Sequence, residues 1–167
     1  ANALTLDGLA QGEHRLEVRG MNPAKAWQRE PAHTRHFVVD ATRHSIRLNE
    51  LLARNLAATN INGIFPDLIE LRNDGAAPYD LAGLRLTDNP SRPDKFTFPA
   101  GAVLEPGAYL VVLAENPTGL PGFHTGFSLS QNGEGVYLYD AAARGGALID
   151  GVVFGPQIAD FSIGRLP

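Results

Sequence analysis

The feature that most constrains this chain is the spacing of its turn signals. Short apolar or alternating segments are separated by Gly, Pro, Asn and Asp at intervals of roughly 8 to 12 residues, which is typical of antiparallel sandwiches and barrels. The 18 Gly and 12 Pro are spread along the whole chain. No helical pattern longer than a few turns lies between the apolar segments, which argues against a parallel sheet. The sequence therefore predicts an all-β fold.

Composition excludes several classes of protein and site. The formal net charge is -4, so no basic field is available to hold the phosphates of a nucleic acid. The chain has no Cys, which removes disulfides, thiolate metal sites and cysteine nucleophiles. No apolar run approaches the roughly 20 residues of a membrane span. We expect no nucleic-acid partner and no membrane-spanning segment.

Two segments of unequal size divide the chain. In residues 1–43, Leu16 and Val18 alternate with charged residues as in a half-buried strand, and residues 36–40 form a further strand. Two or three strands cannot close a sandwich on their own. The segment must pack on residues 44–167, pair with another chain, or be the end of a truncated preceding domain. The exposed edges of such strands favour a homodimer as one of these outcomes.

Residues 44–167 carry the pattern of a complete sandwich. The alternation in residues 46–51 predicts a strand, although residues 48–58 are also compatible with a short helix. The run at residues 109–114 is apolar on both faces, which predicts a central strand with Tyr109 in the core. Further strands are expected at residues 68–73, 81–86, 95–98, 127–129, 136–139, 149–154 and 162–163.

A series of short motifs in residues 44–165 follows one order. The motifs are Asn49-Glu50, residues 67–73 (D-x-I-E-L-x-N), residues 81–88 (L-x-G-x-x-L-x-D), residues 98–101, residues 104–112 (L-x-P-G-x-Y-L-V-V), residues 124–129 (H-x-x-F-x-L), Gly133-Glu134 and residues 162–165 (S-x-G-R). In this order they resemble the lamin tail domain family. Leu68 and Leu84 stand where that family usually has Trp, and both substitutions keep an apolar core position.

The resemblance implies an immunoglobulin-like antiparallel β-sandwich over residues 44–167. It also implies a non-catalytic binding or spacer module of a larger bacterial exported or cell-surface protein, whose partners are neighbouring domains of the same polypeptide. The pattern Gly12-x-His14-x-Leu16-x-Val18 resembles the closing strands of bacterial immunoglobulin-like or fibronectin-like repeats. The chain begins at Ala1 without Met, and we expect it to be a piece of a longer protein.

Nothing in the sequence assembles a catalytic site. The five histidines show no H-x-x-x-H or H-E-x-x-H spacing, so we expect surface or turn histidines. His124 is predicted to fix the loop before it through a hydrogen bond. No serine has a G-x-S-x-G or S-x-x-K context. The sequence thus predicts neither an enzyme nor a cofactor, and a dispersed hydrolase triad is the least favoured alternative.

A calcium site and an aromatic platform remain as binding hypotheses. Aligned on its glycine, the stretch around Asn60, Asn62 and Asp67 lacks the carboxylates that open and close an EF-hand loop, so only a looser calcium site or a plain turn is compatible. Tyr137 and Tyr139 share one face of their strand. If that face is exposed, these two tyrosines and Trp27 favour binding of a polysaccharide such as a cell-surface glycan; if it is buried, the tyrosines belong to the core.

Overall fold

The computed structural model describes residues 6, 9–10, 12–27, 33–39, 44–117 and 119–165, with the backbone alone at residues 38 and 39. The chain divides into two compact units, Ala1–Arg43 and His44–Pro167. We call them the hairpin unit and the sandwich and describe each by itself. The described part of the chain holds no helix with the length and hydropathy that a membrane span requires.

The hairpin unit is built on two antiparallel strands, β1 (Gly12–Val18) and β2 (His33–Val39). Their register places His14 against Phe37, and the two rings stack with centroids 5.5 Å apart. The connecting segment carries an isolated bridge between Met21 and Trp27. No described residue of this unit is fully buried.

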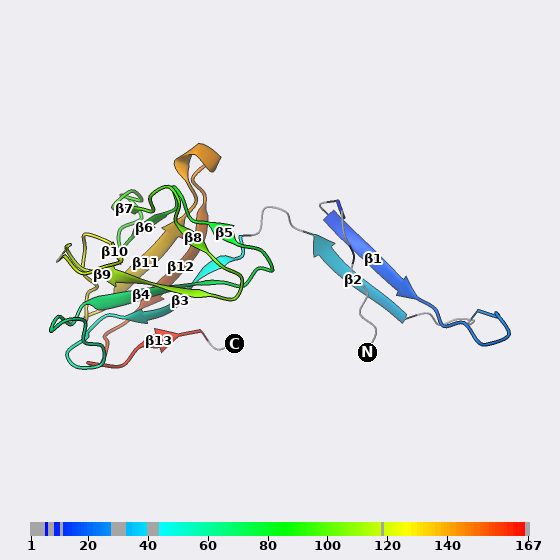
Figure 1. Cartoon of the computed structure of the whole chain (residues 1–167), viewed down its shortest axis with the longest axis horizontal. Coiled ribbons are helices and arrows are strands. Elements are labelled where there is room, and N and C mark those ends of the chain that lie inside the picture. Colours follow the sequence, from blue (N-terminus) through cyan, green and yellow to red (C-terminus); the bar gives the residue numbers. More distant parts are fainter. Residues whose placement is uncertain are drawn as a thin grey trace. The chain divides into compact units, whose positions relative to one another are not determined.

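One layer of the sandwich is a five-stranded sheet in the order β10-β9-β4-β3-β13 (Figure 1). Its strands are β3 (Ile46–Leu52), β4 (Asp67–Asn73), β9 (Tyr109–Ala114), β10 (Phe123–His124) and β13 (Ile163–Gly164). All neighbours are antiparallel except β10, which runs parallel to β9. Strand β3 ends at Leu52. The strand expected at residues 46–51 is therefore confirmed, and the alternative helix over residues 48–58 is not formed.

The second layer is a four-stranded antiparallel sheet in the order β12-β11-β6-β7. Its strands are β6 (Arg85–Thr87), β7 (Phe96–Thr97), β11 (Glu134–Tyr139) and β12 (Leu148–Phe154). A short pair, β5 (Tyr79–Asp80) with β8 (Val103–Leu104), and one 3₁₀ turn, η1 (Ala142–Arg144), complete the unit. The predicted immunoglobulin-like β-sandwich is confirmed.

The core lies between the two layers, because each strand sends every second side chain inward. Strand β4 contributes Ile69 and Leu71, and β11 contributes Val136 and Leu138, all with no exposed side-chain area. Phe98 is also buried and meets the rings of Phe96 and Phe123 edge-on. This single cluster is the main source of stability, at roughly 25 cal/mol per Å² of apolar surface removed from water.

Asn73 ties the end of β4 to three other segments. Its amide nitrogen donates to the carbonyls of Ala77 at 2.8 Å and Leu104 at 2.9 Å, while its oxygen accepts from the Ser45 hydroxyl and the Gly75 N–H. The side chain is completely buried. All of its donors and its acceptor atom are therefore satisfied, as a buried amide requires.

Arg165 closes the sandwich at the other end of the chain. Its guanidinium makes two hydrogen bonds to Asp150 of β12, at 2.7 and 2.8 Å, and one Asp150 oxygen also accepts the backbone N–H of Leu48 in β3. The carboxylate thereby connects strands of the two different sheets. Donation of this hydrogen bond to the Asp150 carboxylate raises the pKa of Arg165, and burial opposes that shift.

The expected strand at residues 81–86 begins only at Arg85, in β6, and the expected strand at residues 127–129 is not formed. Residues 81–84 form a tight turn instead of a strand, with the Leu84 N–H bonded to the Leu81 carbonyl and Gly83 at a φ of 78°. The third residue of such a turn needs a positive φ, and glycine adopts it without strain, as Gly83 does here. Phe127 and Leu129 pack into the core from an irregular segment, without a ladder partner among the described residues.

Two expected core positions are also wrong. Tyr109 is 52 % exposed, because it falls on the outward face of β9, where its ring lies 5.2 Å from the Arg72 guanidinium carbon. Leu68 falls on the outward face of β4 and is half-buried, whereas Leu84 is fully buried as expected. Both faces of β4 and β9 carry apolar residues, so the sequence does not show which face of each strand the second sheet covers.

Candidate functional site

The outward face of the five-stranded sheet carries the most varied chemistry in the sandwich. Strands β3, β4 and β9 place side chains there in three rows, because cross-strand partners stand directly opposite each other. The rows are Leu52–Leu68–Leu113, Glu50–Glu70–Val111 and Arg47–Arg72–Tyr109. We call these nine residues the outer face. Its apolar, acidic and basic rows thus lie in succession along the strands.

The acidic row brings two carboxylates together. Glu50 and Glu70 are direct partners in the register of β3 and β4. The Ser162 hydroxyl donates to Glu50 Oε1, and the Asn49 amide donates to Glu70 Oε1 at 2.7 Å. Like charges directly opposite each other destabilise a sheet. The two hydrogen bonds offset part of that cost, and no described hydrogen bond occupies the second oxygen of either carboxylate.

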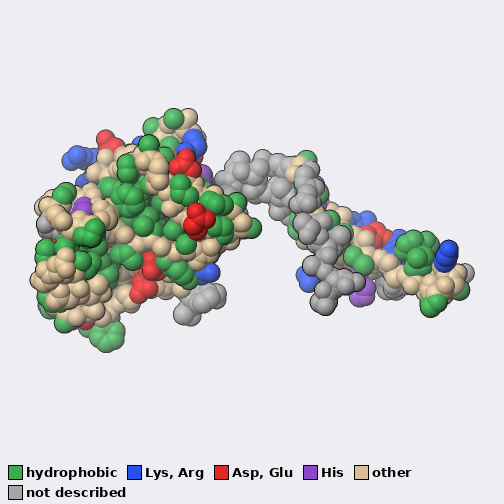
Figure 2. Space-filling view, viewed as in Figure 1, with side chains coloured by type: hydrophobic (Ala, Val, Ile, Leu, Met, Phe, Trp, Pro, Cys, Tyr) green, Lys and Arg blue, Asp and Glu red, His purple; other side chains and the backbone are tan. Residues whose placement is uncertain are grey.

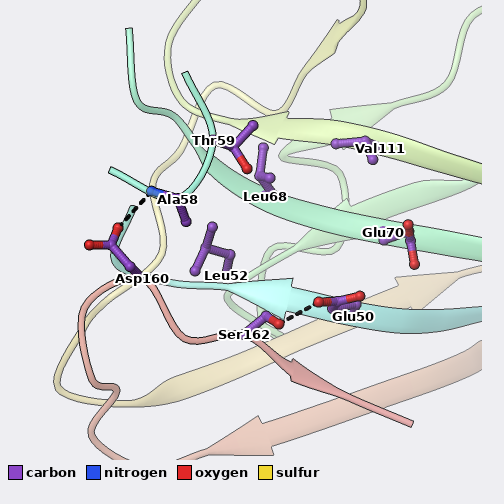
Figure 3. A pocket seen from close by; sticks show the side chains of 9 residues that line it. All are labelled: Glu50, Leu52, Ala58, Thr59, Leu68, Glu70, Val111, Asp160 and Ser162. Atoms are coloured by element: carbon purple, nitrogen blue, oxygen red, sulfur yellow. Dashed lines mark hydrogen bonds between the residues drawn. The ribbon is translucent and has the colours of Figure 1, made fainter. Parts of the chain in front are cut away.

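A hollow of about 270 Å³ opens beside this pair (Figure 3). Its wall is made by Glu50, Leu52, Ala58, Thr59, Leu68, Glu70, Val111, Asp160 and Ser162. Leu52 and Leu68 contribute apolar surface, as does Val111, which stands beside Glu70 on β9 and is 42 % exposed. The hollow therefore combines an apolar wall with three acidic side chains, those of Glu50, Glu70 and Asp160.

Asp160 fixes the loop that borders the hollow. One oxygen of its carboxylate accepts the backbone N–H groups of Leu56, Ala57 and Ala58, at 2.7, 2.7 and 3.0 Å. These hydrogen bonds, led by the one from Ala57, lower the pKa of Asp160. The loop is thus held by a carboxylate that is itself exposed to solvent.

The basic row is tied together by one acid. Arg47 and Arg72 stand opposite each other, and their Nε atoms lie 2.7 and 2.9 Å from the two carboxylate oxygens of Asp74. Arg72 also lies over the ring of Tyr109. Asp74 thus offsets part of the positive charge of Arg47 and Arg72. No described ion pair offsets the negative charge of Glu50 and Glu70, which line the hollow.

A protein-family model named Lamin Tail Domain matches residues 40–156 of the chain. The chain belongs to the lamin tail domain family. No curated protein and no solved structure matches it. Membership indicates an immunoglobulin-like, non-catalytic module and bears out the resemblance found in the sequence motifs. Strand β13 and Arg165 lie beyond the matched residues, yet they pair with β3 and with β12.

The lamin tail domain places Tyr137 and Tyr139 on the outward face of β11, where both are half-buried. A Cβ added to Gly135 would come within 2.6 Å of the Tyr137 ring, and one added to Gly151 within 3.0 Å, so this ring lies flat over two glycines. The ring of Tyr139 lies 5.8 Å from the Arg85 guanidinium carbon. The pair is neither core nor a bare platform, and its role in sugar binding stays a prediction.

Trp27 belongs to the hairpin unit and is 64 % exposed. It borders an open groove that is also lined by the consecutive residues 16–19 of β1 and its end. An exposed Trp beside a groove is compatible with stacking on a sugar or with packing against a protein. The side chain is available for a ligand.

The calcium hypothesis stays a prediction, and the structure shows which contacts already occupy its residues. Asn60 Oδ1 accepts the N–H of Gly63, and Asn62 adopts a φ of 54° in that turn. The two oxygens of Asp67 accept the N–H groups of Asn55 and Leu129. Burial raises the pKa of Asp67, and the two backbone N–H groups oppose that shift. In these contacts Asn60, Asn62 and Asp67 serve to fix the conformation of the surrounding loops.

The described residues nowhere gather three or more His, Cys, Asp or Glu side chains as metal ligands. His124 Nε2 lies 2.9 Å from the Leu120 carbonyl, which confirms the predicted hydrogen bond to the preceding loop. Its other ring nitrogen lies 3.4 Å from Glu115. The histidine therefore joins β10 to the segment that comes after β9.

One polar cluster was not found by sequence reasoning. His44 Nδ1 is hydrogen-bonded to the Tyr79 hydroxyl, and its Nε2 lies 3.8 Å from Asp140, which is almost fully buried. Burial raises the pKa of Tyr79, and the negative charge of Asp140 raises it further. A raised pKa keeps the phenol neutral, so the cluster suits hydrogen bonding and not nucleophilic attack. The three residues are far apart in sequence and match no motif.

Proposed function

We propose that this chain is a non-catalytic accessory module of a larger bacterial exported or cell-surface protein, and that it binds a partner protein through its outer face. Family membership supports the first part, since lamin tail domains are immunoglobulin-like modules. The observation that carries the second part is the hollow lined by the opposed Glu50 and Glu70 together with Val111, which stands beside Glu70 and is 42 % exposed.

The chemistry of the hollow favours a lysine or arginine side chain of the partner. Leu52 and Leu68 offer apolar surface to the aliphatic stem, while the two carboxylates accept hydrogen bonds from the cationic end. A bound cation also removes the repulsion between Glu50 and Glu70. The volume of about 270 Å³ is below the range of most small-molecule pockets, which favours one inserted side chain over a free metabolite.

Titration with a lysine-rich peptide, followed by amide NMR shifts of the ¹⁵N-labelled chain, tests this proposal. The control peptide has the same sequence with acetylated lysines, which removes the charge. We expect shifts at Glu50, Glu70 and Val111 with the charged peptide only. Equal shifts with the acetylated peptide, or none at these residues, would contradict the proposal.

The variant Glu50→Gln/Glu70→Gln should bind the charged peptide about tenfold more weakly, which corresponds to ~1.4 kcal/mol. Glu105→Gln is the matched control, because Glu105 is exposed and does not line the hollow. Mass spectrometry of the surface and secreted fractions of the producing cell tests the location. Peptides of this chain confined to the cytoplasm would contradict an exported protein.

Polysaccharide binding is the second candidate, and the exposure of Trp27 beside an open groove is the observation that favours it. Affinity electrophoresis through gels that contain soluble glycans, together with pull-down on insoluble ones, tests it. Retention that is lost in Trp27→Ala would support this function. Absence of retention on every glycan would count against it.

A further inference from the structure

Strand β1 carries charges of alternating sign on one face. Glu13, Arg15 and Glu17 follow each other at every second position, and Arg19 continues the series directly after the strand. The side chains of Arg15 and Arg19 both bond to Glu17 within the chain. Figure 2 shows basic, acidic and hydrophobic side chains close together along this unit. One edge of β1 is bonded to β2, and the other pairs with no described strand.

This charge order is self-complementary in one antiparallel register. If two copies of β1 pair around a two-fold axis at Leu16, Glu13 stands opposite the partner's Arg19 and Arg15 opposite the partner's Glu17. Opposite charges at directly opposed positions stabilise a sheet. Moving the axis to Arg15 would oppose Arg15 to itself, and moving it to Glu17 would oppose Glu17 to itself. A shift by one residue would place charged side chains on the apolar face.

The apolar side chains of β1 fit the same register. Leu16 would meet the partner's Leu16, and Val18, which is 51 % exposed in the single chain, would stand opposite the partner's His14. The groove beside Trp27 is lined by four consecutive residues, 16–19, whose side chains alternate between the two faces. The groove therefore follows the strand, as a site that accepts another strand should.

Strand β2 lacks these properties. Its residues His33–Val39 include Arg35 and no acid, so no register of two β2 copies would form pairs of opposite charge. Pairing of β1 with the β2 of another copy would be head-to-tail and would leave free edges for further chains. Pairing of β1 with β1 closes at two copies and yields a four-stranded sheet. A sheet of three or more strands is stable where a lone hairpin is marginal.

We propose that two copies of this chain pair antiparallel through β1, with the two-fold axis at Leu16. The interface comprises the four ion pairs and the central Leu16 contact. All residues of the proposed interface belong to the hairpin unit, whereas the outer face belongs to the sandwich. The dimer is thus independent of the proposed function.

Cysteine cross-linking tests the register directly, because the chain has no cysteine of its own. In the full chain, Leu16→Cys places two thiols directly opposite each other at a Cα separation of about 5 Å, within reach of a disulfide. Val18→Cys is the matched control on the same face, since the two copies of residue 18 would be about 14 Å apart. We expect disulfide-linked dimer with Leu16→Cys alone. Equal cross-linking of both variants, or none with Leu16→Cys, overturns the proposal.

Sedimentation velocity over a range of concentrations tests the charges. Arg15→Glu places a glutamate opposite the partner's Glu17 on each side of the two-fold axis. The repulsion should raise the dimer dissociation constant about tenfold. Arg15→Glu combined with Glu17→Arg restores opposite charges at the positions beside the axis and should return the constant to within about threefold of the original. A chain that stays monomeric at all concentrations, or a double variant that fails to recover, contradicts the pairing.

Discussion

The hairpin unit and the sandwich share the same alternating strand pattern, but only the sandwich buries its apolar residues. Leu16 and Val18 alternate with charged residues in β1 just as Ile69 and Leu71 alternate with Glu70 and Arg72 in β4. Ile69 and Leu71 are fully buried, whereas no described residue of the hairpin unit is. Alternation of apolar and charged residues therefore predicts a strand. The apolar face of that strand becomes part of a core only where a second sheet packs against it.

Paired truncations of the same residue type should give the largest difference between the two units. Leu71→Ala removes a fully buried side chain and should lower the free energy of unfolding of the sandwich by about 3 kcal/mol. Leu16→Ala should change it by less than about 0.5 kcal/mol, because the hairpin unit is a separate compact unit. Urea unfolding of the full chain measures both. Equal effects would mean that the two units unfold as one.

Exchange of a buried amide for a carboxylate should have the next largest effect. Asn73→Asp removes both donors to the carbonyls of Ala77 and Leu104, which then face a carboxylate, and should cost about 2 kcal/mol. Asn62→Asp is the matched control, because Asn62 is exposed in a turn and Asp tolerates its positive φ. Urea unfolding should show less than about 0.5 kcal/mol for the control. A small effect at Asn73 would show that water replaces the lost donors.

A smaller effect is expected at Arg165, which tests whether residues beyond the family match belong to the sandwich. Arg165→Lys loses the two-bond geometry with Asp150 and should cost about 1 kcal/mol, since the pair is partly exposed. Arg15→Lys in the hairpin unit is the control and should leave the sandwich unchanged. Thermal unfolding that is identical for all three proteins would show that the two-bond contact between Arg165 and Asp150 adds nothing to stability.

The smallest expected effect is a pH-dependent one at Asp160. Its three backbone N–H donors lower its pKa below the ordinary value of 3.8, so the carboxylate stabilises the fold above that value and loses its effect as the pH falls through the lowered pKa. Asp160→Gly keeps the φ of 65° free of strain and removes the acceptor. The variant should be less stable than the original at pH 7, and the difference should shrink as the pH falls below 3.8 and through the lowered pKa. A difference that is constant with pH would exclude the charge as its cause.

The fold class and most strand positions could be predicted from sequence. Turn spacing indicated an all-β chain, and the motifs in residues 44–165 indicated the family that the family model also finds. Residues 81–84 were misassigned because their alternation is typical of a strand, whereas Gly83 needs a positive φ that only a turn provides. Tyr109 was misassigned because an apolar strand does not reveal which of its faces the second sheet covers.

The candidate site was only partly visible in the sequence. Glu50 and Glu70 belong to two of the sequence motifs, but the sequence did not identify them as a pair. They are opposed because Asn49 forms a bulge in β3, which shifts the register by one residue. A regular ladder would oppose Asn49 to Glu70. Asp160 was not identified at all, because its three donors lie about a hundred residues earlier in the chain.

The sequence by itself determined the strands, the turns and the family, because these depend on local alternation, on glycine and asparagine at turns, and on the order of short motifs. It also determined the charge order of β1. Tertiary structure alone decided which strand faces are covered, which carboxylates meet across β3 and β4, and which loops the buried Asn73 and the half-buried Asp67 hold. Those outcomes depend on register and on packing between distant segments, and neither is encoded in any one segment of the chain.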